Sequence, residues 1–295
     1  MRMRDIYGTG EFRLSIEIFP PKTEAGDAAL FENLQRLVEY RPAFVSCTYG
    51  AGGSTRARTI DLCDEIQKRY HVPATAHLTC VGATRDELQT WIQDARGRGV
   101  NNIMALRGDA PAGANAFPQV DGGLRYANQL VELIRNDFPE MGIAVGGYPE
   151  THQEAPSPAA DLENLQRKVD AGADVVITQL FYDNDDFFRF RDRCDALGIT
   201  VPIVPGVLPV TNFAQIERIA SLCGARLPAG FEGDLKAAGD DKDAQFRVGV
   251  EFATAQCAAL IENGVPGMHF YVLNRSEATS EVLRRIALLG GKSDK

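Results

Sequence analysis

The 295-residue sequence predicts an α/β protein with one (β/α)8 barrel of the TIM type, and two observations indicate this fold. The first is alternation, because short runs of β-forming residues are each followed by a longer stretch with helical periodicity. The second is a repeated joint, in which a helical run ends at a glycine and a short loop leads into the next strand. The phrases ARGRGVNNI, VDAGADVVI and DALGITVPI share this pattern, which is typical of parallel α/β proteins.

Eight runs have the composition of strands. They are residues 14–19, 44–48, 75–79, 102–106, 143–148, 175–180, 201–204 and 268–273. Eight βα units favour a closed barrel over an open doubly wound sheet. A dinucleotide-binding fold would need a GxGxxG turn after an early strand, and the sequence has none.

Helical periodicity separates these runs, with apolar residues recurring every three or four positions. The predicted helices are residues 28–39, 57–70, 85–97, 123–136, 158–171, 185–197, 212–222, 244–262 and 276–289. The stretch 208–265 is too long for one βα unit. We expect it to hold that unit's helix, an exposed loop in the polar phrase FEGDLKAAGDDKDAQ, and an extra long helix between strands seven and eight. No linker is visible, so one domain over residues 1–295 is predicted.

Composition narrows the function classes. The formal net charge is −9, and there is no cluster of basic residues, which disfavours nucleic acid and anionic membranes as partners. No window approaches about 18 consecutive apolar residues, and no apolar run follows the first arginines, so neither a transmembrane helix nor a signal peptide is expected. The six cysteines form no CxxC pair. Reduced thiols in a cytoplasmic protein are therefore expected, rather than zinc ligands or disulfides.

Glu17 is the most informative polar residue, because it lies inside the first predicted strand. Alternation places its side chain opposite Ile16 and Ile18, facing the barrel mouth. A buried carboxylate is costly unless it is partnered or functional. Burial would raise its pKa and suit it to be a general acid near neutral pH. The alternative is a structural glutamate bonded to backbone or arginine.

Other polar residues also fall at predicted strand ends, where barrel enzymes place their catalytic groups. Arg107, Gly108 and Asp109 follow strand four and could bind a phosphate through the cation and a polar heterocycle through the carboxylate. The alternative is a surface turn. The phrase AGGST, residues 51–55, could hold an anion at a helix N-terminus, but it lacks the ending of a P-loop.

His77 and His152 are two of only four histidines. No HxH or HExxH motif exists, so a hydrogen-bonding or cofactor-packing role is favoured over metal ligation, and no metal is expected. Lys168 follows Asp161 by two helical turns; the simpler interpretation there is a solvated helix face.

Read in order, these segments resemble the bacterial-type methylenetetrahydrofolate reductases over residues 15–277. The phrases that carry the resemblance are SIEIFPPKT, FVSCTYGAGGSTRART, AHLTCVGAT, MALRGD, YPETHQEA, LQRKVDAGADVVITQLFYD, VPIVPGVLPVTNFAQ and HFYVLNRSE. Together they are highly specific, with one phrase for each barrel strand.

The resemblance implies a flavoprotein of one-carbon metabolism that reduces 5,10-methylenetetrahydrofolate to 5-methyltetrahydrofolate. NADH or NADPH would reduce non-covalent FAD and leave, and the folate would take its place in a ping-pong cycle. NADH is the expected nucleotide. A homo-oligomer, dimeric or tetrameric, is expected, containing the catalytic barrel without the regulatory domain of eukaryotic relatives.

The resemblance also implies roles for individual residues. Glu17 would be the general acid that opens the bridged folate to an N5 iminium, and Asp109 would lie by the flavin and bond the pterin. Gln179 would orient the folate ring, with Gln215 and Arg275 on the substrate side. The residues implied to bind FAD are Thr48, His77, Arg107, Gly108, Asp109, Tyr126, Ala127, Tyr148, His152, Asp161 and Lys168.

Two features depart from the family pattern. Ile219 stands where relatives carry an aromatic residue that helps gate the substrate face. The loop APAGANAFPQVDGG is also longer than usual, which weakens the assignment of Tyr126.

Two other functions fit a barrel with these residues. A metal-free lyase or aldolase could use the same acids, but a Schiff-base aldolase would need a strand lysine, and no predicted strand contains one. A folate-binding protein without catalysis would leave Glu17 without a purpose.

Overall fold

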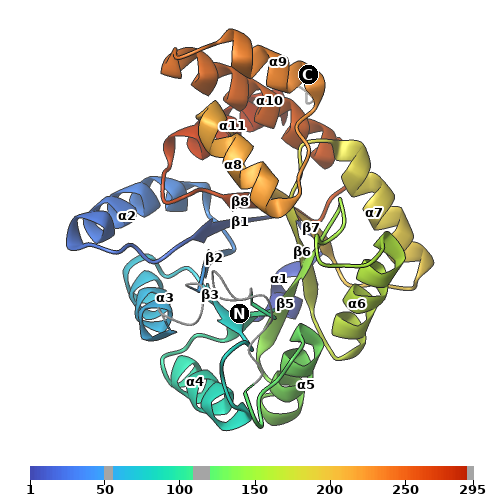
Figure 1. The fold of residues 1–295 in the computed structure, drawn as a ribbon. Coiled ribbons are helices and arrows are strands. Elements are labelled where there is room, and N and C mark those ends of the chain that lie inside the picture. Colours follow the sequence, from blue (N-terminus) through green and yellow to red (C-terminus); the bar gives the residue numbers. More distant parts are fainter. Residues whose placement is uncertain (50–55, 109–119, 291–295) are drawn as a thin grey trace.

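The computed structural model describes residues 1–49, 56–108 and 120–290. Within these residues, eight parallel strands form a closed barrel in which each strand pairs with the next and β8 pairs back with β1 (Figure 1). The strands are β1 (Arg13–Ile18), β2 (Phe44–Cys47), β3 (Ala74–Thr79), β4 (Asn102–Leu106), β5 (Gly142–Gly147), β6 (Val175–Leu180), β7 (Ile203–Val207) and β8 (Gly267–Tyr271). The predicted barrel is confirmed.

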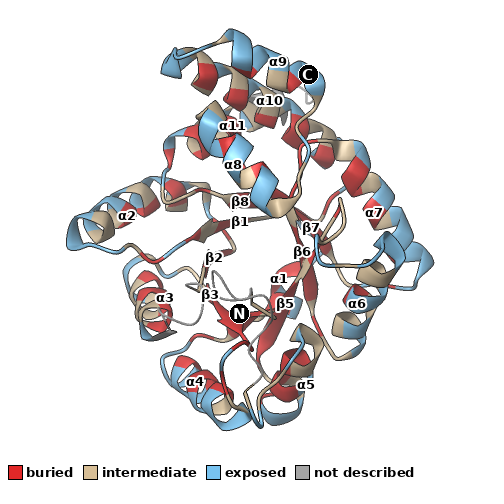
Figure 2. Ribbon diagram, in the orientation of Figure 1, coloured by how far each residue is buried: buried red, intermediate tan, exposed pale blue. Residues whose placement is uncertain are grey.

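Helices surround the barrel as an outer layer, with their buried sides toward the strands and their exposed sides toward solvent (Figure 2). They are α2 (Glu24–Leu37), η1 (Val38–Tyr40), α3 (Arg56–Tyr70), α4 (Arg85–Gly97), α5 (Ala127–Asp137), α6 (Pro158–Asp170), α7 (Asn184–Ala196), α8 (Phe213–Cys223), α10 (Lys242–Glu262) and α11 (Glu277–Gly290). Side-chain caps fix several starts: Thr23, Ser157 and Asn212 each accept a hydrogen bond from a backbone N–H in the first turn.

The position of β7 differs from the prediction, which ended this strand at residue 204. In the structure the strand continues through Pro205 and Gly206 to Val207, because Gly206 pairs with His269 of β8 and closes the barrel. Gly206 is required here, since a Cβ atom would lie 2.6 Å from Cε2 of Tyr271. The turn-like dipeptide is therefore a strand segment that makes room for an aromatic ring.

The stretch between β7 and β8 holds two helices beyond α8, not one. The predicted long helix is α10, and the predicted exposed loop contains α9 (Ala229–Ala237). Phe231 and Leu235 of α9 are buried, and the Phe231 ring stacks on Phe252 of α10 with centroids 3.8 Å apart. The helix was not predicted because its two buried apolar residues are too few to give a helical pattern within a polar segment. Together α8, α9 and α10 form a lobe beside β8 (Figure 1).

A short N-terminal helix, α1 (Met3–Tyr7), was not predicted. It lies at the amino end of the strands, within the ring that they form (Figure 1). Its Met3, Ile6 and Tyr7 are buried in one cluster with apolar residues that line the barrel interior at its amino end, among them Phe44 and Met104. Five residues are too few for a helical period to appear in sequence, so only tertiary packing defines this element.

The barrel interior therefore has two layers of opposite character. Inward-facing residues near the amino end are apolar and pack on α1. Those near the carboxyl end are polar, and the largest apolar cluster lies outside, between the strands and the helices. No helix in the described part of the chain is long and apolar enough to cross a membrane.

Candidate active site

Glu17 lies where the alternation of β1 predicts. Ile16 and Ile18 are buried in the cluster under the helices, so Ser15 and Glu17 face the barrel interior. The Glu17 side chain is 15% exposed, and its Oε2 lies 3.2 Å from Nε2 of His77 and 3.2 Å from Nε2 of His269. One carboxylate oxygen thus sits between two imidazoles from β3 and β8.

Two serines extend this arrangement. Ser46 Oγ lies 2.8 Å from His77 Nε2, and Ser15 Oγ lies 2.8 Å from His269 Nδ1. Ser15 Oγ also donates to the carbonyl of Met268 at 3.4 Å. Glu17, the two imidazoles and the two serines therefore form one hydrogen-bonded cluster inside the barrel.

The direction of the Glu17 pKa contradicts the prediction from sequence. Burial raises the pKa of this carboxyl, as predicted, but the charges and hydrogen bonds of His77 and His269 outweigh burial. The pKa falls from its ordinary 4.5 to about 2. The prediction was wrong because His77 and His269 come from β3 and β8, neither of which adjoins Glu17 in sequence. Glu17 is therefore ionised at neutral pH.

A second group of predicted residues meets at the end of β5. The rings of Tyr148 and His152 contact edge to face with centroids 4.6 Å apart, and the backbone N–H of His152 donates to Asp161 Oδ2 at 2.9 Å. Lys168 Nζ donates to the carbonyl of Gly146 at 2.5 Å and lies 5.9 Å from the Tyr148 ring centroid. Residues of the β5–α6 loop and of helix α6 are thus held against one strand end.

Lys168 does not lie on a solvated helix face. Its partly buried side chain points back to β5, and burial lowers the pKa of the ammonium to about 8, partly offset by the charge of Asp161. A cation that is poorly solvated in this way is stabilised by an anionic ligand.

The RGD segment follows β4, and Asp109 lies outside the described residues. Arg107 Nη1 pairs with Glu154 Oε2 at 2.6 Å, which links this segment to the β5–α6 loop. Gly108 has φ +91°, and a Cβ atom there would lie 2.6 Å from Cγ1 of Val81. Only glycine fits this turn, because both the conformation and the space exclude a side chain.

The remaining predicted flavin residues are spread along the mouth. Thr48 follows β2, where its N–H donates to the carbonyl of Ile18 at 2.9 Å. Tyr126 is the residue before α5 and Ala127 is the first of the helix, with the Tyr126 side chain 49% exposed. The Arg125 guanidinium lies 5.4 Å from the Tyr126 ring centroid. The phrase AGGST lies outside the described residues.

The predicted substrate residues come from β6, α8 and the segment after β8. Gln179 Oε1 accepts from the N–H of Leu180 at 2.9 Å, beside an irregularity in the pairing of β6 with β7. Gln215 lies exposed in the first turn of α8, and Arg275 lies exposed just after β8. Ile219 packs on the apolar cluster of the α8–α10 lobe.

His269 was not singled out from the sequence, although a signal existed. In β8 the buried Met268 and Phe270 belong to the cluster under the helices, so the alternate positions His269 and Tyr271 face the interior. Tyr271 is held there by donating its hydroxyl to the carbonyl of Thr178 at 2.7 Å. The same alternation identifies Ser15 and Ser46.

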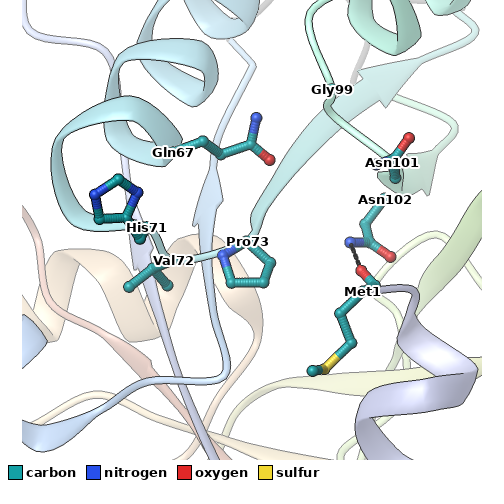
Figure 3. A pocket seen from close by; sticks show the side chains of 8 residues that line it. All are labelled: Met1, Gln67, His71, Val72, Pro73, Gly99, Asn101 and Asn102. Atoms are coloured by element: carbon teal, nitrogen blue, oxygen red, sulfur yellow. Dashed lines mark hydrogen bonds between the residues drawn. The ribbon is translucent and has the colours of Figure 1, made fainter.

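A pocket of about 270 Å³ opens at the amino end of the strands, away from Glu17 (Figure 3). It is lined by Met1, Gln67, His71, Val72, Pro73, Gly99, Asn101 and Asn102. Asn102 joins the chain terminus to β4, because its Nδ2 donates to the Met1 carbonyl at 2.9 Å and its Oδ1 accepts from Met3 N–H at 2.9 Å. In barrel enzymes this face carries stability rather than chemistry. Within the described ranges, no three His, Cys, Asp or Glu side chains are placed to hold a metal ion.

Comparison with known proteins agrees with the resemblance drawn from the motifs. The methylenetetrahydrofolate reductase family model matches residues 2–287. The 5,10-methylenetetrahydrofolate reductase of Salmonella typhimurium is 42% identical over 284 residues, covering 96% of this chain and 93% of that protein. The Escherichia coli protein of the same name is 40% identical over 282 residues, with the same coverage.

The plant relatives are longer. Methylenetetrahydrofolate reductase (NADH) 1 of Arabidopsis thaliana is 37% identical over 298 residues, covering 98% of this chain but 50% of its own length. The chain thus spans about half the length of this relative.

Solved structures share the fold at low identity. A Clostridium thermocellum protein that binds two copies of 5-methyl-5,6,7,8-tetrahydrofolic acid aligns with a TM-score of 0.61 at 14% identity, covering 98% of this chain and 99% of that one. Dihydropteroate synthase from Xanthomonas albilineans aligns with a TM-score of 0.51 at 14% identity, over 95% of this chain and 93% of that one. These likenesses show the barrel alone. The family match and the bacterial relatives both extend over nearly the whole sequence, and the chain belongs to the methylenetetrahydrofolate reductase family.

Proposed function

We propose that this protein reduces 5,10-methylenetetrahydrofolate to 5-methyltetrahydrofolate, with NADH or NADPH as the electron donor and FAD bound in the barrel mouth. Family membership supports the reaction. The observation that carries the assignment of the site is the carboxylate of Glu17 between two imidazoles, at the interior end of a polar mouth.

The mouth has features that suit a flavin nucleotide. Among the described residues, Thr79 Oγ1 at the end of β3 is buried without a hydrogen-bond partner, and the Thr79 side chain packs against Gly108. On this surface of the mouth, a hydroxyl without a protein partner fits a ligand with hydrogen-bonding edges. Lys168 and Arg107 supply positive charge near this surface, as a pyrophosphate requires.

The residues that would hold FAD lie at the carboxyl ends of β2 to β5 and in the loops that follow these strands. Arg107 and Lys168 would meet its charged portion, and Thr48, Tyr148 and His152 would line its remaining surface. Bound there, FAD would supply the hydride-transfer chemistry between the nicotinamide and the folate. The aldolase alternative is disfavoured further, because none of the eight strands contains a lysine.

The folate reaction consumes one proton. Opening the five-membered ring between N5 and N10 breaks the N10–methylene bond, the proton goes to N10, and N5 is left as an iminium that accepts the hydride. Since the pKa of Glu17 is about 2, the carboxylate alone is not the donor at neutral pH. We propose that the acid is the hydrogen-bonded unit of Glu17 with His77 and His269, through which a proton reaches N10. The negative charge of Glu17 then stabilises the cationic iminium.

Spectroscopy of the purified protein tests this function. We expect a yellow protein whose flavin absorbance bleaches on adding NADH without oxygen and recovers on adding methylenetetrahydrofolate. Stoichiometric formation of 5-methyltetrahydrofolate should accompany the recovery. A protein that neither binds FAD nor oxidises a reduced pyridine nucleotide would show the proposal to be wrong.

A further inference from the structure

Phe19 is an exposed aromatic residue next to the proposed acid. It follows β1 directly, two residues after Glu17, and is 43% exposed. Single exposed apolar residues are common on protein surfaces. Phe19 differs by its place, because it follows the proposed acid on the same strand, where an aromatic ring can contact a ligand.

The backbone pattern places Phe19 at the barrel mouth. Ser15 and Glu17 face the interior, so continuing the alternation by one position brings Phe19 to the same side, roughly 7 Å above Glu17. Backbone hydrogen bonds from the segments after β2 and β8 show how far β1 extends toward the mouth before Phe19. The N–H of Thr48 donates to the backbone carbonyl of Ile18 at 2.9 Å, and the N–H of Val272 donates to the backbone carbonyl of Glu17 at 3.3 Å.

The position of Phe19 is fixed by the segment after β8. Asn274 Nδ2 donates to the carbonyl of Phe19 at 2.8 Å, and the N–H of Phe19 donates to Asn274 Oδ1 at 3.0 Å. Leu273 and Asn274 both have positive φ, +47° and +59°, which only a well-supported turn maintains in residues other than glycine. Arg275, a predicted substrate residue, comes next in the chain. The exposed ring and this arginine are therefore held by one rigid joint between β1 and β8.

We propose that Phe19 is a substrate-positioning residue that stacks against the aromatic part of the folate and holds the bridged carbon above Glu17. The inference rests on the proposed function and adds a residue that the sequence motifs did not assign to substrate. Pterin and aminobenzoyl rings are flat, and an aromatic face is the surface that they stack on best. Ile219 cannot supply such a face, since it is aliphatic and packs on the α8–α10 lobe.

Binding of 5-methyltetrahydrofolate to the flavin-loaded protein, measured by calorimetry, tests this role. We expect Phe19→Ala to weaken binding about tenfold and Phe19→Leu to weaken it similarly, because neither offers a π-face. Phe19→Tyr and Phe19→Trp should stay within about twofold of the parent. Phe12→Ala is the matched control: Phe12 is 44% exposed but precedes β1, at the opposite end of the same strand, and its loss should change nothing.

The outcomes separate the two proposals. If the parent binds the folate and Phe19→Leu binds it equally well, the aromatic role is wrong and the proposed function stands. If Phe19→Tyr and Phe19→Trp lose as much affinity as Phe19→Ala, the side chain acts by shape alone and stacking is wrong. A parent protein that binds no folate overturns the proposed function together with this inference. Flavin content should stay equal in all variants, and a loss of FAD from Phe19→Ala would contradict a role confined to the folate.

Discussion

At its amino end the barrel interior is filled by apolar side chains and closed by α1, whereas at its carboxyl end it holds a carboxylate, two imidazoles and two serines. The same strands supply both layers: β2 contributes Phe44 below and Ser46 above. Buried polar groups cost free energy unless they are paired, and even then their net contribution is small. The apolar end offsets this cost, so the chemistry can be assembled at the other end.

The amino and carboxyl ends of the barrel, here called the lower and upper ends, also differ in which elements their contacts join. At the lower end, contacts join an N-terminal helix to the strands and leave the mouth untouched. At the upper end, one oxygen of Glu17 joins β1 to β3 and β8. Substitutions at the two ends should therefore separate stability from activity, and the predictions below test that separation.

The largest expected effect is on activity, at the upper end. Glu17→Gln should lower folate reduction by about 100-fold or more, because the amide cannot relay a proton or stabilise a cation. FAD binding and NADH oxidation with an artificial acceptor should be nearly unchanged. Stopped-flow measurement of each half-reaction checks this. Normal folate reduction by the variant would show that Glu17 is not part of the acid.

At the lower end the effect should be on stability alone. Ile6 of α1 is fully buried, so Ile6→Ala should lower the free energy of unfolding by about 2–5 kcal/mol through lost burial and a residual cavity. Ile6→Val is the conservative control and should cost about 0.5–1.5 kcal/mol. Urea unfolding measures both variants. A change in kcat per folded molecule would contradict the separation of the two ends.

An intermediate effect is expected from pH at Lys168. Burial lowers the pKa of its ammonium to about 8, so its positive charge is present below this pH and is lost as the pH rises above it. If the charge holds an anionic cofactor, FAD affinity should fall with rising pH above about 8, by up to about tenfold per pH unit. Lys168→Met should bind FAD weakly and with little dependence on pH in this range. Lys236→Met, on the exposed side of α9, is the control and should keep the parent's profile.

The smallest expected effect concerns the orphan hydroxyl. Thr79→Val keeps the shape of a side chain whose Oγ1 is buried without a partner in the described structure. Without FAD the variant should be as stable as the parent or up to about 1 kcal/mol more stable, because an unsatisfied group is removed. With FAD bound, the variant should instead be less stable than the parent, because its affinity for FAD should be lowered a few-fold. Thermal unfolding with and without FAD measures both, and equal shifts in the two states would argue against a flavin contact at Thr79.

Much of this arrangement could be predicted because its signals are local. The alternation of β1 placed Glu17 inward, and the order of the strand ends located the mouth. The errors arose where tertiary contacts override local pattern. The predicted strand ended before Pro205 and Gly206, which belong to β7 because Gly206 pairs with β8, and α9 forms because Phe231 packs on Phe252.

The sequence alone determined the barrel, its strand ends and the carboxylate inside β1, because period-two and helical patterns are properties of neighbouring residues. Only the tertiary structure decided the state of that carboxylate. His269 is 252 residues away from Glu17 and reaches it because β8 pairs with β1 when the barrel closes. Burial alone would have raised the pKa of Glu17, whereas burial between two imidazoles lowers it. The charge of the site is thus set by two imidazoles, His77 from β3 and His269 from β8, which no local pattern around Glu17 encodes.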